Sequence, residues 1–124
     1  MKQVLATEQA PAAIGPYSQG IAAGETVYVS GQLPLDPATG AFPEGIAAQT
    51  AQSLKNIQAI LAQQGMTLVN VVKTTVFLAD INDFAEMNKV YGEFFTQPYP
   101  ARSAVQVAKL PKDAPLEIEC IAVK

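Results

Sequence analysis

The apolar residues of the chain recur with two different periods, and each period predicts one kind of element. Between residues 46 and 65 they return every three or four positions, as on one face of a helix, and Gly65 provides a C-terminal stop. The same spacing begins again at about Asp83 and is broken by Pro98 and Pro100. The sequence therefore predicts two amphipathic helices.

Six other segments are short and rich in β-branched or alternating apolar residues, which is typical of strands. Because each helix has a single apolar face, we expect both helices to pack on one side of a six-stranded mixed sheet, in an α+β fold. The strands are apolar on both sides, so the uncovered face of the sheet predicts self-association. No repeat or linker divides residues 1–124, which are expected to form one domain. The predicted strands are residues 2–5, 17–23, 26–30, 71–78, 103–110 and 116–123, with a long loop at 32–45.

The charge pattern argues against nucleic acid and membrane as partners. The net charge is −3, and the eight lysine and arginine residues are scattered rather than clustered into a basic stripe. No apolar run approaches the roughly 18 residues of a membrane-spanning helix, and the first ten residues lack the apolar stretch of a signal peptide. We therefore expect a cytoplasmic protein that binds neither nucleic acid nor membrane.

The residue types that are missing restrict the chemistry. With no histidine and a single cysteine, the chain cannot assemble an ordinary zinc site, a Ser-His-Asp triad or a Cys-His pair. A glycine-rich phosphate loop is missing as well. Cys120 lies in an apolar run, where a thiol usually serves as a small core residue. We expect no metal and no cofactor, so catalysis would depend on carboxylates, Tyr, Ser, Lys, Arg, backbone groups or water.

Arg102 is the only arginine, and it stands where solubility does not require one. It follows Pro100-Ala101 at the beginning of a predicted strand. A guanidinium presents a planar fork whose donors match both oxygens of a carboxylate, which makes Arg102 a candidate for binding a carboxylate ligand. The alternative is a structural ion pair with Glu117 or Glu119.

Two carboxylates share one face of the last predicted strand. Glu117 and Glu119 are two residues apart, so their side chains point to the same side of the sheet. A partly buried carboxylate there could hold and polarise a water molecule, with its pKa raised by burial. A pair of solvated charges on an edge strand is the alternative.

Three further segments contain candidate site residues that are weak signals individually and count only together with the others. Tyr17 follows the rigid turn Ile14-Gly15-Pro16 and is either a pocket wall or a half-buried packing residue. Ser30 and Gly31 end the third predicted strand, where the missing side chain of Gly31 would let a ligand approach the backbone. Asn88 lies beside the apolar stripe of the second helix, where it either reaches a ligand or a neighbouring subunit or stays exposed.

A set of short motifs follows one order along the whole chain, without a large insertion. They are Ala13–Gly20, Val29–Pro34, Val72–Phe77, Pro100–Ser103, and Leu110–Ala114 followed by Ile118-Glu119. Each motif is modest alone, but the ordered set resembles the Rid family of reactive intermediate deaminases, also called YjgF-like or L-PSP proteins.

The resemblance implies a fold like that of small chorismate mutases, assembled as a homotrimer with ligand clefts between adjacent subunits. It also implies cofactor-free hydrolysis of reactive 2-imino and enamine acids, such as 2-aminoacrylate, 2-aminocrotonate and their imines, to 2-keto acids and ammonium. In this sequence the family's site residues correspond to Arg102 as the carboxylate ligand, Glu117 and Tyr17. Backbone at Ser30 and Gly31 would form the wall near the carboxylate, and Asn88 would line the site.

Two positions depart from the family pattern. Cysteine is common two residues after the arginine, where this chain has Ala104, which makes Ala104 a pocket wall that could shift the substrate range. The loop at 96–100 is shorter than in many relatives, which would reshape the mouth of the cleft.

Three other functions compete with the deaminase interpretation. A trimer that binds 2-keto acids or amino acids and regulates a partner would use Arg102 equally well, but it would not need Glu117 for turnover. A ribonuclease or translation inhibitor, an activity attributed to some relatives, fits poorly with the acidic composition and the missing histidine. A holdase-type chaperone would work through exposed apolar surface.

Overall fold

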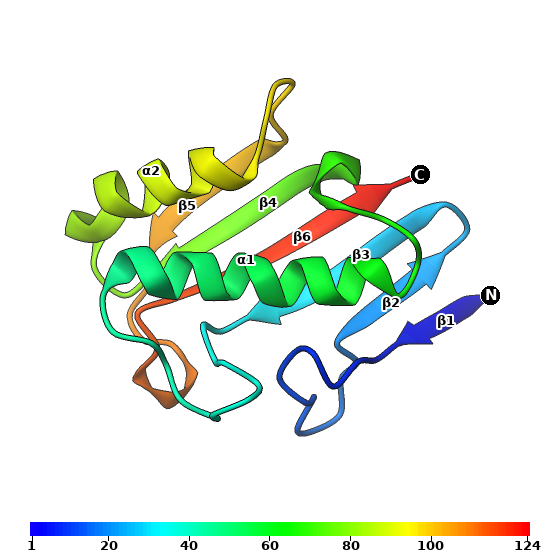
Figure 1. Ribbon diagram of the computed structural model, residues 1–124, viewed down its shortest axis with the longest axis horizontal. Coiled ribbons are helices and arrows are strands. Elements are labelled where there is room, and N and C mark those ends of the chain that lie inside the picture. Colours follow the sequence, from blue (N-terminus) through cyan, green and yellow to red (C-terminus); the bar gives the residue numbers. More distant parts are fainter.

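Two helices lie across one face of a six-stranded sheet in the computed structural model, which describes residues 1–124 (Figure 1). The strand order across the sheet is β1-β2-β3-β6-β4-β5. Neighbouring strands are antiparallel except for β4 and β5, which are parallel and are connected through α2. The predicted α+β architecture, with a mixed sheet and two helices, is confirmed. The elements are β1 (Lys2–Leu5), β2 (Gly20–Ala23), β3 (Thr26–Gln32), α1 (Ile46–Ala62), β4 (Val71–Leu78), α2 (Phe84–Phe94), β5 (Ala101–Gln106) and β6 (Leu116–Val123).

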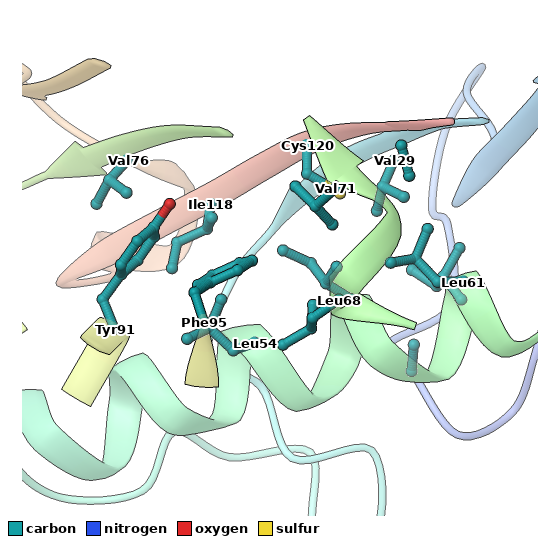
Figure 2. Close-up of a cluster of buried hydrophobic side chains, with 14 of the residues drawn as sticks. Val29, Leu54, Leu61, Leu68, Val71, Val76, Tyr91, Phe95, Ile118 and Cys120 are labelled. Atoms are coloured by element: carbon teal, nitrogen blue, oxygen red, sulfur yellow. The ribbon is translucent and has the colours of Figure 1, made fainter. Parts of the chain in front are cut away.

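The core lies between the helices and the sheet. Leu54, Ile57 and Leu61 recur along the inner face of α1 and are fully buried. Alternate residues of β6, among them Ile118 and Cys120, point from the sheet toward α1 (Figure 2). Cys120 is thus a core residue as predicted, and burial raises the pKa of its thiol to about 12. Neither α1 nor any other helix combines the length and the hydrophobicity that a membrane span requires.

The other face of the sheet has no helix over it (Figure 1). Its side chains include large apolar residues that remain partly or wholly exposed, such as Tyr28 at 51% and Val105 at 45%. Ile121 on β6 and Phe77 on β4 are half-buried on the same face. This open face is the apolar surface that the sequence pattern predicts.

Four predicted strand boundaries are wrong, and strand pairing explains them. The third strand extends to Gln32, which pairs with Ile118, and the fifth begins at Ala101, which pairs with Lys73. Residues 17–19 were expected in the second strand, but β1 offers partners only up to Leu5, which pairs with Gly20. The fifth strand was expected at 103–110, but β5 is parallel to β4 and ends at Gln106, which pairs with Leu78, the last residue of β4. Strand length is set here by the partner rather than by local propensity.

Candidate functional site

Arg102 lies on β5 beneath α2, and α2 supplies its neighbours. Its Nη1 donates a hydrogen bond of 2.7 Å to Oδ1 of Asn88. Its Cζ lies 4.7 Å from the centre of the Tyr91 ring and 5.5 Å from the centre of the Phe84 ring. Phe84 and Asn88 are four positions apart on α2, and Asn88 and Tyr91 are three apart, so the three residues share one face of the helix. A cation over an aromatic face is attracted by the ring quadrupole, which holds the half-buried guanidinium between helix and sheet.

The guanidinium has no acidic partner within the chain. The one salt bridge of the structure joins Lys109 to Asp113, and both side chains are largely exposed. An intrachain ion pair between Arg102 and Glu117 or Glu119, the alternative considered from the sequence, is therefore absent. Because one bond to Asn88 uses only one of five N–H donors, most of the fork remains for a ligand.

A second group of candidates surrounds a hollow of about 580 Å³. Tyr17, Ser30, Gly31 and Glu117 all line it. Gly31 is next to the carboxylate, because a Cβ at this position would lie 2.6 Å from Cδ of Glu117. Ser30 and Gly31 also fall within a register shift between β3 and β6, which leaves them without a pairing partner on β6. Backbone and carboxylate thus face the same space.

The wall that carries Tyr17 is a loop held down by a buried amide. The Gln19 side chain is 4% exposed, accepts from the backbone N–H of Thr7 and donates to the carbonyls of Thr7, Ala10 and Pro11. The Ser30 hydroxyl donates to the carbonyl of Ser18, and the Ser30 N–H donates to the carbonyl of Gln19. The Ser30 carbonyl also accepts from the Gln32 side chain, so both donors of Ser30 and its carbonyl are engaged within the chain, and only the lone pairs of its hydroxyl remain to contact a ligand.

Burial raises the pKa of the Glu117 carboxyl, and the negative charge of Glu119 on the same face raises it further. Glu117 is half-buried in the hollow, whereas Glu119 is exposed. A carboxylate with a raised pKa is a stronger base than an ordinary one, and it can take a proton from water more readily.

The two groups of candidates lie on opposite faces of the sheet. Arg102 pairs with Thr74 on β4, and Glu117 pairs with Phe77. Thr74 and Phe77 are three residues apart on β4, so their side chains point to opposite faces of the sheet. Each paired residue shares the face of its partner, so Arg102 faces α2 while Glu117 faces the open side. We call Arg102, Asn88 and Ala104 the cationic half and Tyr17, Ser30, Gly31 and Glu117 the carboxylate half. A single chain does not bring the two halves together.

Three neighbours of these halves were not singled out from the sequence. Phe84 and Tyr91 belong to the apolar stripe of the second helix, and their spacing around Asn88 was the available signal. Lys112 lines the carboxylate half's hollow, with a left-handed backbone at φ 57°. That conformation has no clear signature in a turn without glycine. No three Cys, Asp or Glu side chains converge as a set of metal ligands.

Replacing Gly31 with alanine is expected to displace the Glu117 carboxylate with little loss of stability. The new methyl group would overlap the end of a flexible side chain, which can rotate away. Displacement of a reacting group by about an ångström can cost up to about 10²-fold in rate. For the imine hydrolysis that the family resemblance implies, we therefore expect kcat to fall about tenfold or more. Thermal unfolding and steady-state kinetics measure the two effects.

Gly92→Ala is the matched control for Gly31→Ala. Gly92 lies in α2 with nothing within 4 Å of an added Cβ. This substitution should leave kcat unchanged and, by removing freedom from the unfolded chain, should leave the melting temperature equal or slightly higher. An equal loss of kcat in both variants would contradict the role given to the Gly31–Glu117 contact.

Comparison with known proteins finds full-length relatives. Residues 7–124 match the profile of the family described as Endoribonuclease L-PSP. The 2-iminobutanoate/2-iminopropanoate deaminase of Salmonella typhimurium is 54% identical, with 100% of this chain and 99% of the relative aligned. Two Escherichia coli crystal structures are also similar: the YjgF gene product, 52% identical with a TM-score of 0.94, and TdcF with bound serine, 48% identical with a TM-score of 0.94. Each covers 98% of both chains.

Proposed function

The chain belongs to the Endoribonuclease L-PSP family, to which the Rid proteins belong, and from that premise we propose that it hydrolyses 2-imino acids to 2-keto acids and ammonium. The curated relatives that support this are 52–54% identical over the whole chain and carry the name of that deaminase. The observation that carries the proposal is the half-buried Arg102 of β5, which contacts Asn88 and Tyr91 of α2 and has no acidic partner. Such a guanidinium is suited to a carboxylate ligand.

We propose that the complete site forms between subunits of a homotrimer. Within one chain the cationic half and the carboxylate half face opposite sides of the sheet, so neither can complete the other. A second copy placed with its hollow against α2 and β5 of the first would unite them. The uncovered apolar residues of the open face, such as Tyr28 and Val105, supply surface for this association.

The proposed reaction divides the work between the two halves. Arg102 binds the carboxylate of the substrate through two parallel hydrogen bonds, and the N–H of Gly31 assists. Glu117 orients a water molecule and takes its proton as the oxygen bonds to the imine carbon, while the imine nitrogen takes a proton. The resulting carbinolamine then passes its hydroxyl proton to the nitrogen as the carbon–nitrogen bond breaks, so that ammonia leaves and the 2-keto acid remains. Tyr17 closes the pocket and relays a proton.

A neighbouring structure agrees with the carboxylate-binding part of this proposal. The TdcF crystal structure, with a TM-score of 0.94 to this chain, contains bound serine. Serine and a 2-imino acid share a carboxylate on the carbon next to the reacting nitrogen. The same recognition by Arg102 would serve a 2-keto acid sensor, so turnover must be tested separately from binding.

The endoribonuclease name of the family has no supporting feature in this chain. The net charge is −3, and the hollow of the carboxylate half contains Glu117 with a single lysine, Lys112. Nucleic-acid binding depends on clustered cationic side chains that neutralise phosphates. That the chain binds no nucleic acid stays a prediction.

A coupled assay tests the proposed function directly. Threonine or serine dehydratase supplies the imine, semicarbazide competes as an imine trap, and appearance of the 2-keto acid is followed. Addition of the protein is expected to accelerate ketone formation and to reduce the amount of trapped adduct. Unchanged rates at stoichiometric protein concentrations would mean that the chain is not an imine deaminase.

A further inference from the structure

A buried pair of hydroxyls lies directly behind the guanidinium. The Tyr91 ring points from α2 toward the sheet, with its oxygen at the far end (Figure 2). That oxygen shares a 2.7 Å hydrogen bond with Oγ1 of Thr74, which is fully buried, and Tyr91 itself is only 5% exposed. Thr74 is also the residue that pairs with Arg102 across β4 and β5. The Tyr91 ring of α2 therefore contacts both Thr74 on β4 and the guanidinium of Arg102 on β5.

Stability alone does not require these two hydroxyls. Both sit in an apolar core, where phenylalanine and valine would fill nearly the same space. Replacing both partners of a buried hydrogen bond with apolar groups of the same shape is often close to neutral. What the bond adds is direction, because a phenylalanine ring at this site could rock about its side-chain torsions while a ring tethered at its tip cannot.

The direction of the ring matters because Arg102 lies over it. With 4.7 Å between Cζ and the ring centre, the guanidinium follows the orientation of the Tyr91 face. Bidentate binding of a carboxylate requires the plane of the fork to match the plane of the ligand. If the Tyr91 ring changed its orientation, the plane of the Arg102 guanidinium would vary with it, although the positive charge would stay in the same place.

We propose that Thr74 and Tyr91 are positioning residues that fix the plane of the Arg102 guanidinium for its carboxylate ligand. The effect on catalysis rests on the proposed function, whereas the effect on Arg102 itself does not. Asn88 complements the pair, because it holds Nη1 from the exposed side while the ring supports the face. Neither Thr74 nor Tyr91 contacts the reacting atoms.

The experiment compares Tyr91→Phe, Thr74→Val and the double variant with two controls. Thr74→Ser keeps the hydroxyl and should restore wild-type behaviour. Thr50→Val removes a hydroxyl that is equally buried, bonded to the carbonyl of Ile46 in α1 and outside the contacts of Arg102. Kinetics give KM and kcat, titration gives the affinity for pyruvate as an unreactive 2-keto acid, and NMR follows the Nε–H group of Arg102, which gives one signal because the chain has one arginine.

Removing either hydroxyl is expected to raise KM and the Kd for pyruvate roughly three- to tenfold, with kcat nearly unchanged, because a ground-state binding contact is weakened. The Nε–H group should become more mobile. The double variant should resemble each single variant, because both delete the same bond. Thr74→Ser and Thr50→Val should keep wild-type KM and mobility, even if Thr50→Val lowers the melting temperature.

Unchanged KM, affinity and Arg102 mobility in Tyr91→Phe and Thr74→Val would overturn the positioning role. The same would follow if Thr50→Val altered Arg102 as strongly as they do. If the wild-type chain shows no deaminase activity, the proposed function fails, and pyruvate titration and NMR still decide whether the hydroxyl pair orders the guanidinium.

Discussion

Replacing Arg102 with alanine is expected to lower kcat/KM for imine hydrolysis by between about 10² and 10⁴-fold. Two charge-assisted hydrogen bonds to the substrate carboxylate contribute about 1.5–3 kcal/mol each, and each 1.36 kcal/mol is about a factor of ten in rate. Arg102→Lys should recover only part of the loss, because a lysine keeps the charge but has no planar fork. The dehydratase-coupled assay measures both variants.

Lys109→Ala is the matched control for the Arg102 substitutions. It also removes one positive charge, from an exposed pair with Asp113. Exposed pairs contribute little, so its kcat/KM should equal that of the wild type. If Arg102→Ala retained full activity, or if Lys109→Ala lost as much, carboxylate recognition by Arg102 would be refuted.

Glu117→Gln is expected to reduce kcat by about 10²-fold or more while leaving the affinity for pyruvate largely intact. Positioned general bases typically contribute 10²–10⁴-fold, and glutamine can hold a water molecule but cannot take its proton. Titration with pyruvate and single-turnover kinetics separate binding from chemistry. A protein that only senses 2-keto acids would have no turnover for this substitution to remove.

The pH dependence of kcat provides an internal check on this assignment. Because burial and the charge of Glu119 raise the pKa of Glu117, kcat should fall with decreasing pH at a value above that of an ordinary glutamate. Glu119→Gln removes one of these two causes, so it should move this acidic limb to lower pH and leave the plateau value unchanged. An acidic limb that persisted in residual Glu117→Gln activity would belong to another group.

The same shift determines how Glu117 affects stability. A raised pKa in the folded state means that the folded protein binds this proton more tightly than the unfolded chain does. Stability from this group is therefore highest at acidic pH and is lost as pH rises through the raised value. Glu117→Gln should melt at a temperature equal to or above that of the wild type at pH 7, and the difference should vanish below about pH 4.

Periodicity was sufficient to predict the elements, and pairing decided where they end. The apolar spacing of residues such as Leu54 and Ile57 is local, so the helices could be predicted from it. The end of β5 depends on the length of β4 and on a parallel register, which local sequence does not encode. Residues 17–19 have strand propensity, but β1 ends at Leu5 and offers them no partner. The buried amide of Gln19 holds them as a loop instead.

The identity of the candidate site residues could be predicted from the sequence, but their arrangement in space could not. Arg102 was recognisable as a lone arginine, and Glu117 by its place on an alternating strand. Their separation onto opposite faces depends on registers between β4 and both of its neighbours. The contact of Arg102 with the Tyr91 face depends on how α2 crosses β5, and an aromatic residue in a helix stripe is most often only core.

The placement of Arg102 and Glu117 on opposite sides of one sheet has a consequence for mixed populations of chains. In the proposed trimer each polypeptide lends its guanidinium to one neighbour and its carboxylate to the other. A ring that mixes copies lacking Arg102 with copies lacking Glu117 always contains one junction where both intact groups meet. Two inactive gene products would thus rescue each other when co-assembled, and turnover belongs to the ring rather than to any one polypeptide.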